Sequence, residues 1–434
     1  MQLWFLITAG IGLCYLLFAK RRFDCFSVAF LSACVYFIPG FVGYTLMPTK
    51  TSMEEAVDLE IETYLVMIVV LIAILMGAVL LDLASEKKPP ALRLNDTAHT
   101  GTWAVMIAIL GYVLLIASVG DVLFDDKSIL IKNLNRWHVI GATAAPLGAV
   151  LCFVYRLRFP FVIAMLILLF DVYIGFRISL AVAMIAIFTL WLGRDGQQRL
   201  ALNNWRAGIL GSIVVCFLFV YKQLYEVVKL GMWDFIVERL QDPDLYVAAI
   251  GMSEPFTIQV ILNEVIVQRF VVGMGHLREV LYQFALFSPE LGVKPVSFND
   301  LFQSSLFPTD MEYGMANNIW AEMWSTGGWP LLLVFVTIFV LMLVVGSYLI
   351  RSSDKTVSSV AALTFSYWAF YIHRNDLAFQ INLEKRVIIL AAICMLLSKL
   401  QHLARLVAMS TKEKDDLSFA GNVPSLNGES SSHH

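Results

Sequence analysis

The chain has 434 residues, of which 59% are hydrophobic and only 15% are charged. This composition leaves too little polar surface for a soluble globular protein and indicates a protein that crosses a membrane several times. The net charge of −3 gives no reason to expect a nucleic acid partner. The sequence has no Walker loop, no GxGxxG motif and no residue spacing typical of a zinc site, so we expect no nucleotide, metal or other cofactor.

Long apolar stretches define the predicted helices. A helix that crosses a bilayer needs about 20 mostly apolar residues. Such stretches lie at 2–19, 25–47, 61–82, 103–120, 138–155, 159–174, 178–193, 207–224, 328–350, 357–372 and 387–404. We therefore expect an all-α, polytopic integral membrane protein with about 11 transmembrane helices.

Basic residues in the short loops predict the orientation, because they concentrate on the cytoplasmic side. They occur at 20–22, 83–102, 156–158, 194–206 and 351–355. All of these loops fall on one face if the N-terminus lies outside. The opposite, extracytoplasmic face then carries the acidic loop 51–62, the loop 121–138, the GFR turn, the segment 225–327 and the loop 373–385.

The long segment 225–327 divides the predicted membrane region. We predict that residues 1–224 form an eight-helix membrane bundle, 328–408 a three-helix membrane segment, and 409–434 a polar, disordered cytoplasmic tail that ends in a tag remnant. Within 225–327, the stretches 226–240 and 254–286 carry apolar residues at helical spacing with few charges. This pattern is typical of helices at the membrane interface, so we expect a partly helical lid over the outer mouth of the bundle.

Basic side chains at the outer ends of the predicted spans are the first candidate site residues. Arg177 interrupts an apolar stretch from Phe159 to Leu192, just after Gly175, which suits a tight turn. It either reaches into the outer headgroup layer or binds a phosphate with its planar guanidinium group. Lys222, at the end of the eighth predicted span, has the same two interpretations, and its tyrosine neighbours favour the first.

Further basic residues occur later in the chain. Arg269, Gly273 and His276 have spacings that would place the arginine and the histidine on one helical face. Alternatively, the helix breaks at the GMG sequence and leaves Arg278 and its neighbours solvated. A final cluster, His373, Arg374, Asn375 and Asp376, lies at the outer end of the tenth predicted span. Together these residues predict a cationic outer rim.

Carboxylates and amides complete the predicted site. Asn317 and Asn318 precede Glu322 by about one helical turn, and Trp324 follows it in the sequence NNIWAEMWSTGGWP. These residues either cap a helix, or form a partly buried surface on which aromatic rings and amides bind a sugar. Glu254 either interacts with the N-terminus of its own helix, after Ser253 and before Pro255, or serves as a base.

The arrangement resembles the bacterial O-antigen and polysaccharide repeat-unit polymerases. The resemblance rests on about eleven spans, Gly175 and Arg177 in the GxR turn, the long late loop, and the closing segment with Glu322, Trp324, Gly327 and Gly328. It covers most of residues 1–405 in architecture, through short motifs. The loop lacks a second arginine motif at the spacing described for some members, so Arg269 and Arg278 correspond to the family only by role.

The resemblance implies a fold of the integral-membrane GT-C type in the bacterial inner membrane, with the site facing the periplasm. It also implies a metal-independent, inverting transfer of a growing glycan from undecaprenyl pyrophosphate to an incoming lipid-linked repeat unit. Arginines would stabilise the leaving pyrophosphate, and Glu254, His276 or Glu322 would accept the hydroxyl proton. Lipid-linked oligosaccharides and membrane lipids would be its partners, together with a chain-length regulator and a flippase.

Other activities fit parts of the same pattern. An O-antigen ligase would use the same donor with another acceptor. A lipid-linked oligosaccharide flippase would also need a basic cavity, although its charges should lie at mid-membrane and its two halves should be related. A glycosyltransferase that uses polyprenyl-phosphate sugars would place its acid in the first outer loop, where Glu54, Glu55 and Asp58 occur.

Overall fold

The structure of the chain is a computed structural model. It describes residues 1–48, 53–84, 98–124, 127–194, 196, 199–229, 231–243, 245–246, 253–285, 296–307 and 315–420. The helices are α1 (Gln2–Phe18), α2 (Cys25–Tyr36), α3 (Ile38–Val42), α4 (Ile61–Ala84), α5 (His99–Val119), α6 (Lys127–Asn133), α7 (Arg136–Tyr155), α8 (Arg158–Tyr173), α9 (Ile178–Arg194), α10 (Leu200–Asn203), α11 (Trp205–Lys229), α12 (Trp233–Gln241), α14 (Glu254–Val267), α15 (Met274–Leu281), α16 (Phe298–Leu306), α17 (Ile319–Ile350), α18 (Lys355–Phe370) and α19 (Leu377–Ala420). Three short 3-10 helices, η1 (Gly120–Phe124), η2 (Tyr282–Phe284) and η3 (Tyr371–Arg374), and the strands β1 (Tyr44–Pro48) and β2 (Met53–Asp58) complete the described elements.

The fold is that of a helical membrane protein, as the composition predicts. Within the described ranges, five helices are long and apolar enough to cross a bilayer: Ile61–Ala84, His99–Leu123, Arg136–Tyr155, Ile319–Ile350 and Leu377–Met409. Shorter apolar helices occur at Gln2–Phe18, Cys25–Tyr36 and Ile178–Gly193. Each of the eleven predicted stretches contains a helix.

The second predicted span, 25–47, is wrong as a single helix. Helix α2 ends at Tyr36, because Pro39 has no N–H to donate to the carbonyl of Val35 and its ring clashes with that carbonyl. The short helix α3 follows and ends at Gly43, whose φ of +96° is a left-handed conformation that favours glycine. The chain then enters β1, which pairs antiparallel with β2.

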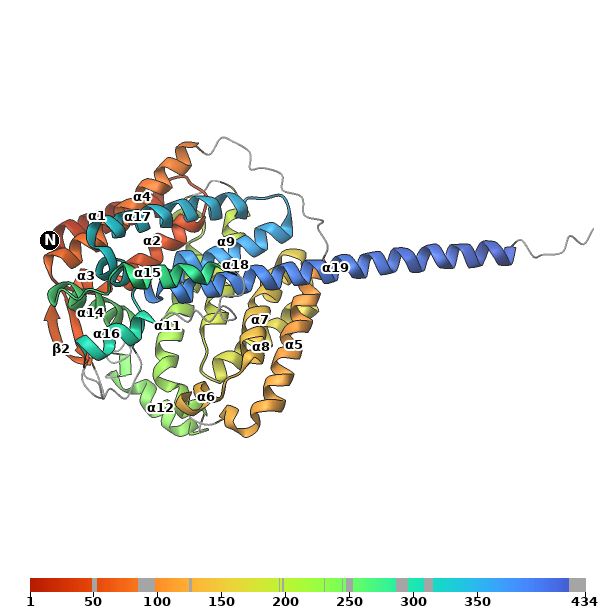
Figure 1. The fold of residues 1–434 in the computed structure, drawn as a ribbon, viewed down its shortest axis with the longest axis horizontal. Coiled ribbons are helices and arrows are strands. Elements are labelled where there is room, and N and C mark those ends of the chain that lie inside the picture. Colours follow the sequence, from red (N-terminus) through yellow and green to blue (C-terminus); the bar gives the residue numbers. More distant parts are fainter. Residues whose placement is uncertain are drawn as a thin grey trace, which may run out of the picture.

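Two hydrophobic cores hold the bundle together. The first core joins α1, α2 and α4 with α14, α16 and α17. The second core joins α5, α7, α8 and α9 with α19. Helix α18 contributes side chains to both cores and packs against α2, α7, α9, α17 and α19, so it is the central helix of the fold (Figure 1).

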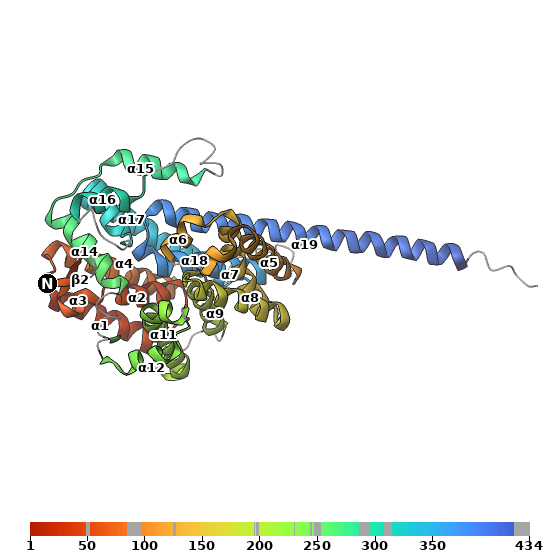
Figure 2. The same cartoon turned by 90° about the horizontal axis from the view of Figure 1, so that it is seen from below.

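The predicted lid segment is divided between two sides of the molecule. Helix α12 lies beside α11, whereas α15 and α16 lie on the opposite side, next to α17 (Figure 2). Helix α14 is buried in the first core over most of its length, rather than lying at the interface as predicted. Of the two alternatives for 254–286, the helix break at the GMG sequence is confirmed, because the backbone breaks between α14 and α15, where Arg269 (φ +52°) and Gly273 (φ +85°) are left-handed.

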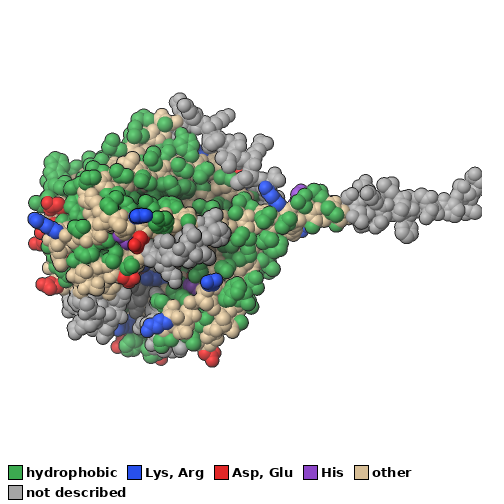
Figure 3. Space-filling model, viewed as in Figure 1, with side chains coloured by type: hydrophobic (Ala, Val, Ile, Leu, Met, Phe, Trp, Pro, Cys, Tyr) green, Lys and Arg blue, Asp and Glu red, His purple; other side chains and the backbone are tan. Residues whose placement is uncertain are grey.

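The surface agrees with a location in a bilayer. Many large apolar side chains are exposed on α4, α5, α8, α17 and α19. Hydrophobic side chains cover most of the visible face, and a group of charged side chains lies at its left end, near the β-hairpin (Figure 3). An apolar outer surface of this extent is expected where lipid tails replace water as the solvent.

Candidate functional site

The first part of the candidate site is the turn between α8 and α9. The chain reverses there because Gly175 has a φ of +100°, which side chains with a Cβ atom rarely adopt. The turn is closed by backbone hydrogen bonds from Gly175 and Phe176 back into the last turn of α8. Arg177 follows directly, as the GxR pattern predicts, and its side chain is 24% exposed.

Glu254 is the residue on which two of the predicted arginines converge. It lies in the first turn of α14, and its side chain is 27% exposed. Its Oε2 forms an ion pair with Arg374 at 2.5 Å, and its Oε1 lies 3.9 Å from a guanidinium nitrogen of Arg177. The three residues come from segments that are far apart in the sequence. They form a cluster with one more positive than negative charge, open to solvent on one side.

Arg374 is held in place through its own backbone and through its side chain. Its carbonyl accepts a hydrogen bond from the backbone N–H of Asn317 at 3.1 Å. The side-chain amide of Asn317 donates to Asp376 at 3.1 Å, and its Oδ1 is buried without a hydrogen-bond partner among the described residues. The guanidinium group of Arg374 also stacks over the ring of Tyr371, 4.9 Å from its centroid.

A buried pair, His276 and Glu322, contacts the connection between α18 and α19, which carries Arg374. His276 Nε2 lies 2.9 Å from Glu322 Oε1, and the residues are 8% and 0% exposed. The other carboxylate oxygen of Glu322 accepts the backbone N–H of Leu377 at 2.8 Å. Burial opposes a charge on His276, but the hydrogen bond and negative charge of Glu322, together with Asp376, raise the pKa of His276 above its ordinary value. Protonation of the imidazole stabilises a carboxylate that would be costly to bury alone.

Two other predicted site residues have structural contacts. Asn318 caps α17 by accepting the N–H groups of Trp320 and Ala321, and its amide donates to the carbonyl of Ile258 at 2.8 Å. His373 is fully buried and accepts the indole N–H of Trp320 at 3.1 Å. Burial lowers the pKa of His373 to about 3, so this ring is neutral and out of reach of a ligand in this structure.

The structure does not bring the remaining predicted residues into the Arg177–Glu254–Arg374 cluster. Arg269 and Arg278 are exposed, and the break between α14 and α15 keeps Arg269 and His276 off a common helical face. Trp324 is half-buried and packs edge-on against Trp329, with ring centroids 4.9 Å apart, beside the kink at Gly327 and Gly328. Lys222 belongs to α11, and its side chain lies outside the described part of the chain.

Two tyrosines near the cluster were missed in the sequence. Tyr36, at the end of α2, and Tyr371 both lie close enough to Glu254 and the arginines to interact with them electrostatically. Tyr371 lies only three residues before Arg374, so the YIHRND sequence offered a signal for it. Tyr36 ends an apolar stretch and has no signal of its own, because only the packing of α2 against α14 and η3 brings it to this place.

The cluster has the composition of an anion site with a base. Two guanidinium groups share one carboxylate, so a phosphate group can replace that carboxylate and form hydrogen bonds with both arginines. The displaced carboxylate of Glu254 then becomes available to accept a proton. Comparison of the chain with protein-family models, with curated proteins and with solved structures found no match in any of the three.

Proposed function

We propose that this chain is a polysaccharide polymerase of the O-antigen type, embedded in the bacterial inner membrane through about eleven spans. Its donor is a growing glycan on undecaprenyl pyrophosphate, and its acceptor is a sugar hydroxyl of an incoming lipid-linked repeat unit. The Arg177–Glu254–Arg374 cluster faces the periplasm in this proposal, in agreement with the basic residues of the opposite loops.

The observation that carries the proposal is the convergence of Arg177 and Arg374 on Glu254. Arginines that only interact with lipid headgroups extend separately into the headgroup layer, so two of them are not expected to share a carboxylate from a third segment. These two are each about a quarter exposed, which lets a ligand reach them while their charges stay partly shielded from water. A lipid pyrophosphate needs such a pair, because negative charge builds up on it as it leaves.

The proposed reaction uses the cluster in two ways. The acceptor oxygen attacks the anomeric carbon of the donor, the bond from that carbon to the pyrophosphate oxygen breaks, and its electron pair stays on the leaving pyrophosphate. Arg177 and Arg374 stabilise this developing charge. Glu254, released from the arginines by the pyrophosphate, takes the proton of the acceptor hydroxyl. No other reactant is needed, and attack opposite the leaving group inverts the anomeric centre.

The buried pair has a positioning role in this proposal. His276 and Glu322 are almost inaccessible, and Glu322 already accepts the N–H of Leu377, three residues after Arg374. Their contact fixes the connection that carries Arg374, so Glu254 is the better candidate for the base. His276 and Glu322 stay alternative bases if this connection moves when substrate binds.

A ligase would use the same arginines and the same donor, and it differs only in the acceptor. A flippase is favoured less, because the arginine cluster lies in connections at one end of the helices rather than at mid-membrane. These three activities leave different products, so one strain comparison separates them.

The test is the polysaccharide pattern of a strain that lacks the gene and is complemented at equal membrane levels. Intact protein and Arg136→Ala, an exposed arginine at the start of α7, should restore a ladder of polymer lengths. Arg177→Ala should leave the core with a single repeat unit, as in the deletion strain. Long polymer that stays on the lipid carrier in the deletion strain would identify a ligase, and repeat units that stay on the cytoplasmic side would identify a flippase.

A further inference from the structure

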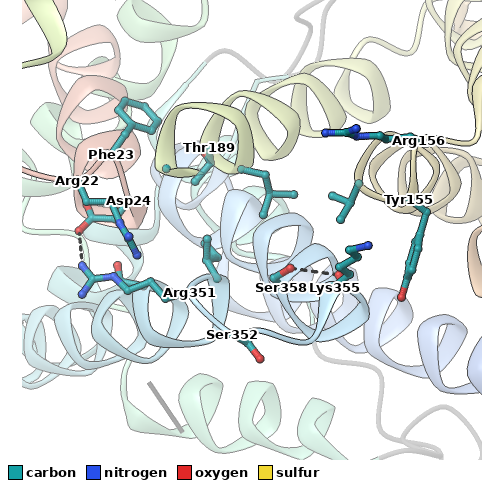
Figure 4. A pocket seen from close by; sticks show the side chains of 15 residues that line it. Arg22, Phe23, Asp24, Tyr155, Arg156, Thr189, Arg351, Ser352, Lys355 and Ser358 are labelled. Atoms are coloured by element: carbon teal, nitrogen blue, oxygen red, sulfur yellow. Dashed lines mark hydrogen bonds and ion pairs between the residues drawn. The ribbon is translucent and has the colours of Figure 1, made fainter. Parts of the chain in front are cut away.

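A second polar site lies at the other end of the same helices. A cavity of about 630 Å³ is lined by Arg22, Arg156, Arg351 and Lys355, together with one carboxylate, Asp24. Figure 4 shows Arg22, Asp24 and Arg351 on one side of this cavity and Arg156 and Lys355 on the other. Arg22, Arg156 and Arg351 lie in the connections α1–α2, α7–α8 and α17–α18, and Lys355 begins α18; we predict all of these connections on the cytoplasmic side.

The cavity is separate from the Arg177–Glu254–Arg374 cluster. Arg156 precedes α8 and Arg177 follows it, while Lys355 begins α18 and Arg374 follows it. Helix α8 has 16 residues and is therefore roughly 24 Å long. The two sites are thus at opposite ends of the helices that connect them, and a ligand of one does not touch the other.

The single carboxylate of the cavity is already used by arginines. Asp24 forms ion pairs with Arg21 at 3.2 Å and with Arg351 at 3.6 Å, and it also caps α2. Burial and the nearby positive charge of Arg351 lower the pKa of Arg22, although Asp24 opposes this shift. Among the residues that line the cavity, four basic side chains therefore accompany a single carboxylate.

The preference for basic residues in cytoplasmic loops explains why four of them occur near this cavity, but not why they line the same cavity. That preference is satisfied by arginines that extend separately into solvent. Here Arg156, the C-cap residue of α7, lines one cavity together with basic residues from two other parts of the chain. Phe23, Leu190 and Ile350 contribute apolar surface to the same cavity. Its volume is within the range of roughly 300–1,000 Å³ that small-molecule sites occupy.

We propose that this cavity binds the phosphate group of an anionic ligand, with Arg156 and Lys355 as the exposed contacts and Arg22 and Arg351 across the cavity from them. The phosphate belongs either to an anionic lipid of the adjacent leaflet or to a soluble phosphate compound. Arg156 and Lys355 are exposed, so either ligand can reach them without a change of the fold. The inference is independent of the proposed transfer reaction.

The test compares purified wild-type protein with Arg156→Gln/Lys355→Gln, with Arg156→Lys/Lys355→Arg, and with Arg158→Gln. Arg158 is an exposed arginine at the start of α8, two residues after Arg156, that does not line the cavity. Native mass spectrometry measures binding of phosphatidylglycerol against phosphatidylcholine, and a thermal shift measures binding of inorganic phosphate against chloride. The wild type, the charge-conserving variant and Arg158→Gln should bind one phosphate ligand, and the double glutamine variant should bind it at least about tenfold more weakly.

Selective retention of phosphatidylglycerol without a phosphate-dependent shift identifies the lipid, and the reverse identifies a soluble ligand. The proposal is overturned if neither phosphate source binds, or if the double glutamine variant binds as well as Arg158→Gln. Size-exclusion elution at the wild-type position shows that the variants are folded.

Discussion

Replacing Arg374 with Gln removes one of the two guanidinium groups proposed to stabilise the leaving pyrophosphate. A guanidinium and a phosphate charge about 4 Å apart attract each other by roughly 4 kcal/mol at the effective dielectric constant of a protein surface. The side chain is 23% exposed, so screening reduces this to about 2–3 kcal/mol. A loss of that size in the transition state slows transfer roughly 30- to 150-fold.

The assay is the rate of chain extension by purified enzyme with a lipid-linked repeat unit. The loss should appear in kcat/KM. One part raises KM, because the arginines already bind the pyrophosphate of the donor, and the other part lowers kcat, because further negative charge develops as the bond breaks. Arg269→Gln is the matched control, since Arg269 is exposed at the end of α14 and lies outside the cluster. The reasoning is refuted if Arg374→Gln keeps a rate within about threefold of wild type, or if Arg269→Gln loses as much activity.

Three further predictions concern stability. Gly328→Ala, at a φ of +60° in the kink of α17, should lower the free energy of unfolding by about 1 kcal/mol or more. Gly208→Ala, at an open position in α11, is the control and should not lower it. Denaturation of both variants in the same detergent measures the difference. Asn318→Ala removes the cap of α17 and the buried side-chain donor to Ile258, so the free energy of unfolding should fall by about 2 kcal/mol. An unchanged melting temperature would show that the cap is unimportant. The raised pKa of His276 in the folded protein means that its stabilisation is complete below its unfolded pKa near 6.5 and is lost as the pH rises through the folded value. Melting temperatures should therefore fall over that range in the wild type and stay flatter in His276→Gln.

Helix positions were predictable from the sequence because an apolar stretch of membrane length must satisfy its backbone polar groups internally, and a helix does so within one segment. The predicted helices are interrupted where the backbone leaves the helical region. Pro39 divides the second predicted span, which was expected as one helix, and the left-handed residues Arg269 and Gly273 separate α14 from α15, as one of the two alternatives for 254–286 predicted. Gly273 carried a local signal for this break, but an arginine at positive φ is uncommon and has none.

The members of the candidate site were predictable one by one, but not their partners. Arg177 interrupts an apolar stretch, Glu254 begins one, and Arg374 belongs to a polar cluster at the end of a predicted span, where charged side chains are candidates for function. Their convergence depends on the packing of α14 against α2 and η3, which no local pattern encodes. The same holds for His276 and Glu322, which are 46 residues apart and meet only because α15 lies against α17.

Helices α8, α9 and α18 run between the Arg177–Glu254–Arg374 cluster and the basic cavity. The distribution of charged residues along these helices favours a transferase over a carrier. Helix α9 has no charged residue between Ile178 and Gly193, and α18 has none after Lys355. In α8, Asp171 near the outer end is the only charged residue after Arg158. A pathway for a lipid pyrophosphate along these helices would need polar groups at mid-membrane to replace the lost hydration. Their charged residues are instead concentrated at the two ends, as expected if each face binds its own anion and none crosses between them.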